Sequence, residues 1–217
     1  MKKIILSATI LASTLWAVSC NQKTTKEENT EVTQEVAPTE AGTATYSYDS
    51  SATSILFTAY KYTERAGVGG KFTDFSITAG NETAATPEEL LTGATFSIPV
   101  SSIKTGDASR DHKIKEFFFG TLNATDVLKG SIKEIKEGKV IVDLTMNSVS
   151  KEISLDYSID AQNVLRLKGN LDVSIFDALP GIEKLNEICH DLHTGSDNIS
   201  KLWPDVDITI KSTLMRN

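Results

Sequence analysis

The stretch VIVDLTMN, residues 140–147, decides the fold, because its apolar residues Val140, Val142, Leu144 and Met146 recur at every second position. Successive side chains of a β-strand point to opposite faces of its sheet, so this period predicts a strand with one dry face and one wet face. The same period returns after Tyr46 in residues 55–59, 94–100, 153–159, 165–175 and 206–210.

Two weaker strands, at about 68–79 and 125–136, bring the expected number to about eight. Short links, such as Glu137-Gly138 between two of them, favour antiparallel neighbours. A sheet with one apolar face must cover that face, either by closing on itself or by folding over as a sandwich. We therefore predict an all-β fold and favour an eight-stranded antiparallel barrel, while a sandwich stays open as the alternative.

Two stretches break this period and predict two short helices. Residues 109–119 begin at Ser109, a residue type that caps helix N-termini, and place Phe117 and Phe118 on one face. Residues 180–193 carry apolar side chains at spacings of three and four. This second helix falls between the last two strands in the sequence and could lie over one mouth of a barrel.

The N-terminus has the signature of an export signal. Two lysines precede a mainly apolar run, and the sequence AVSC at 17–20 resembles a bacterial lipobox, in which the cysteine is lipidated and the chain is cut before it. The apolar run is shorter than the roughly 20 residues that a membrane-spanning helix needs. The segment after it is rich in Thr and Glu and poor in large apolar residues, which predicts disorder. The predicted division is a signal peptide at 1–19, a lipidated Cys20 with a disordered tether at 20–45, and a β-barrel domain at 46–217.

Charge and cysteine content narrow the partners and the location. The full chain carries a formal charge of −7, and loss of Lys2 and Lys3 with the signal takes it to −9. An acidic protein is a poor partner for nucleic acid, so that class is set aside. With Cys20 lipidated, only Cys189 remains and no intrachain disulfide can form. We predict a membrane-anchored lipoprotein of the cell envelope, on the periplasmic face or the outer-membrane surface, and leave a homodimer open.

Three motifs resemble the YceI-like family. Residues 54–61 (SILFTAYK) and 68–72 (VGGKF) are similar to its first hairpin. Residues 96–106 (FSIPVSSIKTG) followed by 110–118 (RDHKIKEFF) match its central strand, turn and helix, and residues 203–210 (WPDVDITI) resemble its last strand.

The resemblance covers roughly residues 46–214 and implies an elongated, eight-stranded, lipocalin-like barrel. Its long apolar channel would take an isoprenoid chain, as a prenyl phosphate or a quinone. The chain departs from the family pattern at residues 122–127, which are poor in apolar side chains, and in the additional helix at 180–193. Both departures could narrow or cap the channel.

These features predict a non-enzymatic carrier or reservoir for a long isoprenoid lipid. The alternative is a structural or interaction module of the envelope whose barrel is filled solid. A hydrolase that uses Asp111 and His112 ranks last, because the sequence shows no nucleophile elbow, phosphate loop or zinc helix motif. No catalytic residue, metal or cofactor other than a bound isoprenoid is predicted.

The candidate ligand contacts are aromatic and aliphatic side chains at strand or helix spacing, which also suit a solid core. The predicted head-group contacts are Arg110, His112 and Lys61, since an arginine fork binds phosphate in a bidentate manner. The alternative for Arg110 is a helix cap with an Arg–Asp pair. Cys189, His190 and His193 are interpreted as a buried structural cysteine and solvent-facing histidines. The predicted channel lining is Phe57, Phe72, Phe96, Phe117, Phe118, Phe176, Leu144 and Leu155.

Overall fold

The computed structural model describes residues 44–217, so the predicted signal peptide, the lipidation site Cys20 and nearly all of the tether lie outside the described residues. Within this range no helix is long and apolar enough to cross a membrane. The strands are β1 (Tyr46–Ser47), β2 (Thr53–Lys61), β3 (Ala66–Phe72), β4 (Ser76–Thr78), β5 (Thr95–Pro99), β6 (Ile103–Lys104), β7 (Val127–Lys136), β8 (Lys139–Met146), β9 (Val149–Ile159), β10 (Val164–Asp172), β11 (Leu202–Thr213) and β12 (Met215–Arg216).

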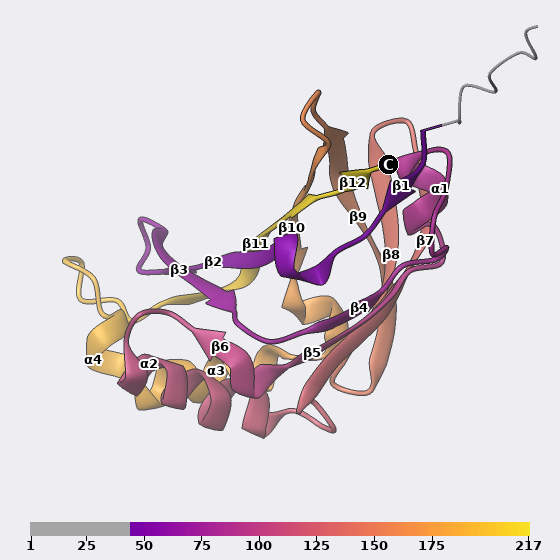
Figure 1. Ribbon diagram of the computed structural model, residues 1–217. Helices are drawn as coiled ribbons and strands as arrows, with labels where there is room; N and C mark the ends of the chain where they lie inside the picture. Colours follow the sequence, from indigo (N-terminus) through magenta and orange to yellow (C-terminus); the bar gives the residue numbers. More distant parts are fainter. Residues whose placement is uncertain (1–43) are drawn as a thin grey trace, which may run out of the picture. The chain divides into compact units, whose positions relative to one another are not determined.

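Ten of these strands form one antiparallel sheet in the order β4-β5-β7-β8-β9-β10-β11-β2-β3-β6, and β1 pairs with β12 apart from it. Strands β7 to β10 follow one another as a meander. Tight turns join them, and Glu137 and Gly138 between β7 and β8 both have positive φ. Such turns match the right-handed twist of paired strands. The sheet curls strongly, so that its apolar face turns inward (Figure 1).

The predicted all-β class is confirmed, whereas the predicted count of eight strands is wrong. The strand expected at 68–79 is broken into β3 and β4, and the one expected at 94–100 continues past a turn into β6. Because β3 pairs with β6 while β4 pairs with β5, the two ends of the sheet meet at this kink. Buried Ser102 stabilises the kink, since its hydroxyl bonds the carbonyl oxygens of Asp74 (3.0 Å) and Pro99 (2.7 Å).

The helices lie at the two ends of the curled sheet (Figure 1). The predicted N-cap Ser109 is wrong: Asp107 precedes the helix, and its Oδ1 accepts the N–H of Arg110 at 3.0 Å. The α-helices are α1 (Pro87–Leu91), α2 (Ala108–Lys113), α3 (Leu179–Ile188) and α4 (His190–His193). After α2 the chain continues through a π turn (Ile114–Phe118) and a 3-10 turn (Phe119–Thr121), and further 3-10 turns cover Ser50–Ala52, Val100–Ser102 and Val173–Phe176.

The apolar interior has two halves. One lies toward α2 and α3 and contains the buried phenylalanines Phe57, Phe72, Phe118, Phe119 and Phe176. The other lies under α1 and is built from aliphatic side chains. We call it the aliphatic cluster; its buried members are Leu90, Leu91, Val140, Val142, Leu155, Leu165, Leu167 and Leu214.

Candidate functional site

An apolar cavity of about 280 Å³ lies between the curled sheet and the helices α2, α3 and α4. Cavities of this kind, apolar with a few convergent polar groups, are the common form of small-ligand sites. The apolar lining is Phe57, Ala59, Val68, Phe72, Ile103, Ile114, Phe118, Phe119, Leu128, Met146, Leu171, Val173, Ile182, Leu185, Leu192, Leu202, Val206 and Ile208. The other lining residues are Tyr60, Lys61, Asp107, Ser109, Arg110, Lys113, Cys189, His193 and Trp203.

The sheet wall depends on a glycine opposite a phenylalanine. Gly70 of β3 is the register partner of Phe57 on β2, and a Cβ at position 70 would lie 2.2 Å from the Phe57 ring. The missing side chain therefore provides the space in which this ring lies. Phe72, two residues further along β3, places its ring centroid 5.7 Å from that of Phe57.

The opposite wall comes from the π turn after α2 and from α3. The rings of Phe118 and Phe119 meet edge to face with centroids 4.8 Å apart, a favourable aromatic geometry. Gly181 of α3 packs directly on this pair, because a Cβ there would lie 2.8 Å from both the ring and the carbonyl oxygen of Phe118. A glycine at this position lets α3 approach closely enough to close the wall.

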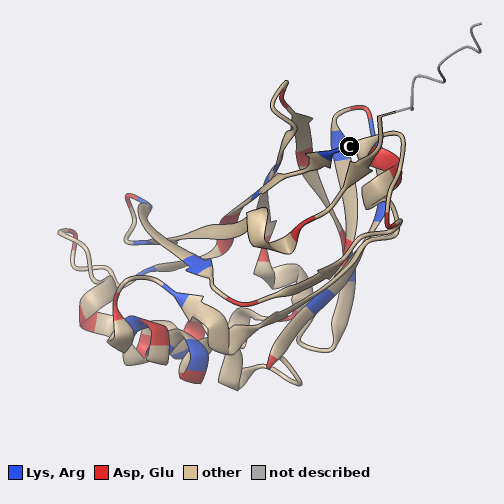
Figure 2. Ribbon diagram, in the orientation of Figure 1, with Lys and Arg blue, Asp and Glu red and all other residues tan. Residues whose placement is uncertain are grey.

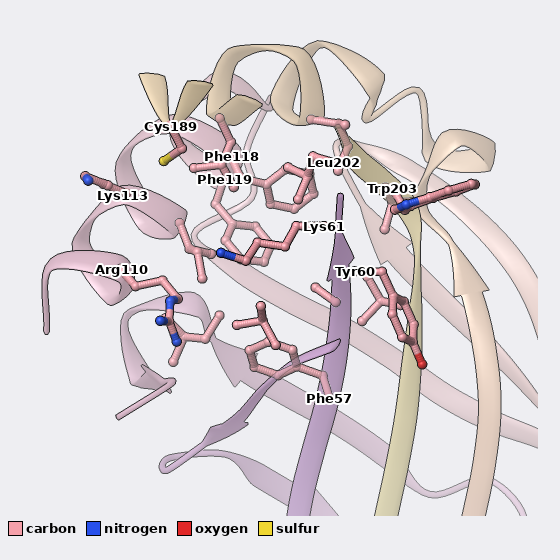
Figure 3. A pocket seen from close by; sticks show the side chains of 18 of the residues that line it. Phe57, Tyr60, Lys61, Arg110, Lys113, Phe118, Phe119, Cys189, Leu202 and Trp203 are labelled. Atoms are coloured by element: carbon pink, nitrogen blue, oxygen red, sulfur yellow. The ribbon is translucent and has the colours of Figure 1, made fainter. Parts of the chain in front are cut away.

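Three cationic side chains stand at the mouth of the cavity. Lys61 lies at the end of β2, and Arg110 and Lys113 lie one turn apart on α2. Figure 3 shows Lys61 reaching from β2 toward the α2 side of the cavity. Arg110 has a carboxylate 3.8 Å away, from Asp107, whereas no ion pair of Lys61 or Lys113 occurs in the described part of the chain. The mouth therefore offers positive charge beside an apolar interior.

The α4 segment closes over this mouth and is held by hydrogen bonds. The ammonium group of Lys61 donates to the carbonyl oxygen of Leu192 at 2.9 Å. The Nδ1–H of His193 donates to Oδ1 of Asn186 at 3.0 Å. Burial, together with the nearby charges of Lys61 and Lys113, lowers the pKa of His193 to about 4. His193 is therefore neutral at pH 7.

The predicted environment of the Cys–His segment is correct for the cysteine and wrong for one histidine. Cys189 is buried in the cavity wall, and burial raises the pKa of its thiol. His190 is exposed, but His193 is half-buried and lines the cavity. His193 lies at the end of α4 beside α3, where it bonds Asn186.

Asp111 belongs to the structure of the turn and lies outside the cavity lining. Its Oδ1 accepts both the N–H and the hydroxyl of Thr105 at 2.7 Å, and Lys104 lies 3.8 Å from its other oxygen. Burial raises the pKa of Asp111, but the bonds from Thr105 and the charge of Lys104 outweigh burial and leave the pKa below its ordinary value. Charges of both signs lie along this helical segment (Figure 2).

The structure brings together only part of the predicted site. Phe57, Phe72 and Phe118 line the cavity, as do Lys61 and Arg110. His112, on the same helix as Arg110, is exposed and lies outside the lining. The predicted residues outside the lining are Phe96, Phe117, Phe176 and Leu144, which belong to or pack against the phenylalanine half, and Leu155, which belongs to the aliphatic cluster. The ligand contacts themselves stay a prediction.

Sequence reasoning missed Lys113, His193 and Trp203 at the mouth. Lys113 could have been found, because it follows Arg110 by three residues and so shares its helix face. Trp203 packs against the cations of Arg65 (4.5 Å) and Lys201 (4.1 Å), and no short-range pattern predicts these contacts.

The curled sheet and the cation-rimmed cavity place the chain in the class of small β-proteins with an internal apolar site. More particularly, the chain belongs to the YceI-like family, because the model of the YceI-like domain matches residues 46–214. The resemblance drawn from the sequence motifs is thereby confirmed. No curated protein is significantly similar to the chain.

Solved structures with the same fold are distant in sequence. A polyisoprenoid binding domain from Saccharophagus degradans, implicated in plant cell wall breakdown, is 16% identical with a TM-score of 0.55, covering 79% of this chain and 97% of its own. Burkholderia cenocepacia BcnA is 14% identical with a TM-score of 0.52, covering 77% and 98%. A mutant of the Campylobacter jejuni YCEI protein is 20% identical with a TM-score of 0.51, covering 72% and 89%. At these identities the likeness establishes the fold alone.

Proposed function

We propose that the protein binds an isoprenoid lipid, with the chain in the apolar cavity and the head group at the cationic mouth, and acts as a carrier or reservoir. The observation that carries this proposal is the combination of 18 apolar lining residues with the cluster of Lys61, Arg110 and Lys113 at one opening. Membership of the YceI-like family and the polyisoprenoid binding domain among the structural relatives support it.

The energetics favour a chain-like apolar ligand. Each buried methylene group contributes about 0.8 kcal/mol, so a tail needs no polar partner inside the cavity. The interior offers a branched hydrocarbon two aromatic pairs, Phe57 with Phe72 and Phe118 with Phe119. The ionised groups in the lining, Lys61, Asp107, Arg110 and Lys113, come from the end of β2 and from the α2 segment and are partly or fully exposed, so a polar head group beside them keeps access to water.

We further propose that the head group is recognised by charge. Lys61 and Lys113 are free of ion pairs within residues 44–217, so a phosphate would meet their charge without displacing a protein carboxylate. Hydrogen bonds to charged groups contribute about 1.5–3 kcal/mol, which corresponds to roughly a tenfold or larger change in affinity. A neutral quinone would gain less from these residues.

Binding can be measured through Trp203, which lines the mouth and is the single tryptophan outside the predicted signal peptide. Farnesol and farnesyl phosphate should each change its fluorescence in a saturable manner. Lys113→Met should weaken farnesyl phosphate about tenfold and leave farnesol within about twofold, because the Lys113 ammonium makes no hydrogen bond or ion pair within residues 44–217. Lys71→Met, on the exposed face of β3, is the matched control and should change neither. Absence of saturable binding, together with organic extracts of the native protein that hold no apolar compound, would refute the proposal.

A structural or interaction module remains the second candidate, and one observation favours it. The aliphatic cluster fills the half of the sheet under α1 with tightly buried side chains, as expected of a core built for stability. Failure of every isoprenoid to bind would select this candidate. We propose for either role that Cys20 carries a lipid and holds the protein at the cell envelope after cleavage of residues 1–19.

A further inference from the structure

The cavity ends in a similar way on three strands of the sheet. On three strands an inward-facing residue lines the cavity, while the inward-facing residue two positions further toward α1 does not. These pairs are Phe57 then Ile55 on β2, Ile208 then Ile210 on β11, and Met146 then Leu144 on β8.

Strand register shows that β2 and β11 share this level, whereas on β3 Phe72, the partner of Ile55, still lines the cavity. Phe57 is the register partner of Ile208, and Ile55 is the partner of Ile210. Both lining residues therefore lie in one row, and both non-lining residues lie in the next. Ile55 is 4% exposed, so the row beyond the cavity is closely packed.

Phe96 of β5 stands at the same boundary. It is half-buried and packs against both the phenylalanine half and the aliphatic cluster, as do Ile153 and Ile210. Its ring lies over Gly130 of β7, where a Cβ would be 2.4 Å from the ring. We call Ile55, Phe96, Leu144 and Ile210 the floor of the cavity. None of the eight buried members of the aliphatic cluster lines the cavity beyond this floor.

The size of the cavity limits the length of chain that it can hold. Its 280 Å³ is almost twice the roughly 150 Å³ of an engineered cavity that binds one benzene molecule, so it suits roughly 12 carbon atoms. The path along β2 from Phe57 to Lys61 is four residue steps, or at most about 13 Å. Both measures correspond to two or three isoprene units.

We infer that the cavity is blind and selects isoprenoids by length, holding two or three units of the tail and leaving further units outside the mouth. This inference rests on the proposed function and sharpens it, because it replaces the long channel expected from the sequence by a short site closed by the floor. The favoured ligand is a farnesyl-sized chain. A longer lipid is held by one end only.

A series of prenyl alcohols tests the inference with the unaltered protein. The affinity of each alcohol would be measured by displacement of an apolar fluorescent probe, using geraniol, farnesol, geranylgeraniol and solanesol. Their partition into detergent micelles would give the increase in affinity per isoprene unit that is expected when burial has no limit. Affinity should rise about tenfold or more from geraniol to farnesol and less than about threefold from farnesol to geranylgeraniol. If the affinity for the protein instead rises in parallel with micelle partition up to solanesol, the blind cavity is refuted, while the proposed function still stands. If neither these alcohols nor farnesyl phosphate binds, the proposed function fails as well.

Variants of one floor residue provide an independent test. Phe96→Ala should deepen the cavity, so that the chain length beyond which affinity stops rising moves from farnesol to geranylgeraniol. Phe96→Leu should produce part of this change and replaces the alanine variant if that variant does not fold. Phe75→Ala is the matched control, since Phe75 is half-buried against the phenylalanine half alone and lies outside the lining. If affinity still stops rising at farnesol in folded Phe96 variants, the assignment of the floor is contradicted.

Discussion

Replacement of Asn147 by alanine should destabilise the fold more than the same replacement at Asn163. Asn147 occupies the β8–β9 turn with a φ of 53° and is buried. Its side-chain amide donates to the carbonyl oxygens of Phe176 (2.9 Å) and Asp177 (3.0 Å), and its Oδ1 accepts the N–H of Asn123 (2.7 Å). One side chain therefore ties three segments together at the helical end of the sheet.

The expected loss follows from these contacts. A hydrogen bond contributes about 1 kcal/mol net, so three bonds lost from a buried site cost about 3 kcal/mol. Left-handed backbone at a residue other than Gly or Asn adds about 1 kcal/mol. Asn163→Ala is the matched control, because Asn163 has a φ of 58° but its side chain makes no hydrogen bond within residues 44–217. We expect losses of about 4 and about 1 kcal/mol for the two variants.

Urea unfolding and thermal unfolding, both followed by circular dichroism, would give the free energy of unfolding and the melting temperature of each variant. The difference of about 3 kcal/mol should appear as a melting temperature roughly 6–12 °C lower for Asn147→Ala than for Asn163→Ala. Equal losses within about 0.5 kcal/mol would refute the reasoning, since the hydrogen bonds would then contribute nothing beyond the backbone cost that both variants share.

Two further predictions concern pH and anchoring. Because burial holds the pKa of His193 near 4, below its ordinary 6.5, the unfolded chain takes up a proton in this range before the folded one. Stability should therefore fall by on the order of 1–2 kcal/mol as the pH drops from 6.5 to 4, since solvent screens a half-buried group. His193→Gln should flatten that slope in urea titrations, and an unchanged slope would exclude His193 as its source. Cys20→Ala should abolish incorporation of labelled fatty acid and release the protein from membranes on fractionation. Retention of the alanine variant in the membrane fraction would contradict the anchor.

The alternation of apolar residues was enough to predict most strands, because period two is a local property. The kinks that split two strands were not predictable in this way, since the alternation runs on through Ile98 and Val100 while the backbone turns at Ser102. Helix α1 is too short to show a helical period. Its capping signal was nevertheless present, since Thr86 precedes Pro87 and its hydroxyl oxygen accepts the N–H of Glu89 at 3.2 Å.

The candidate site was harder to predict because it depends on which half of the interior is filled. Leu144 and Met146 follow one alternation on β8, yet only Met146 lines the cavity. The row at which the cavity ends is set by side chains that meet across distant strands. On α2, the inward position of Arg110 was expected, but His112 lies outside the lining and Lys113 lies within it.

The brevity of β4 and β6 has a consequence for association between copies of the protein. A sheet can recruit a foreign strand through the free N–H and carbonyl groups of its outermost strands, and long flat margins of this kind promote fibre growth. Here the outermost strands contain three and two residues and bend at the kink. At β4 and β6 an incoming chain would find too few consecutive groups to extend the ladder, although residues 66–70 of β3 lie beyond the pairing with β6. The broken strands thus shorten the ladder that a second copy of the protein could join at β4 and β6.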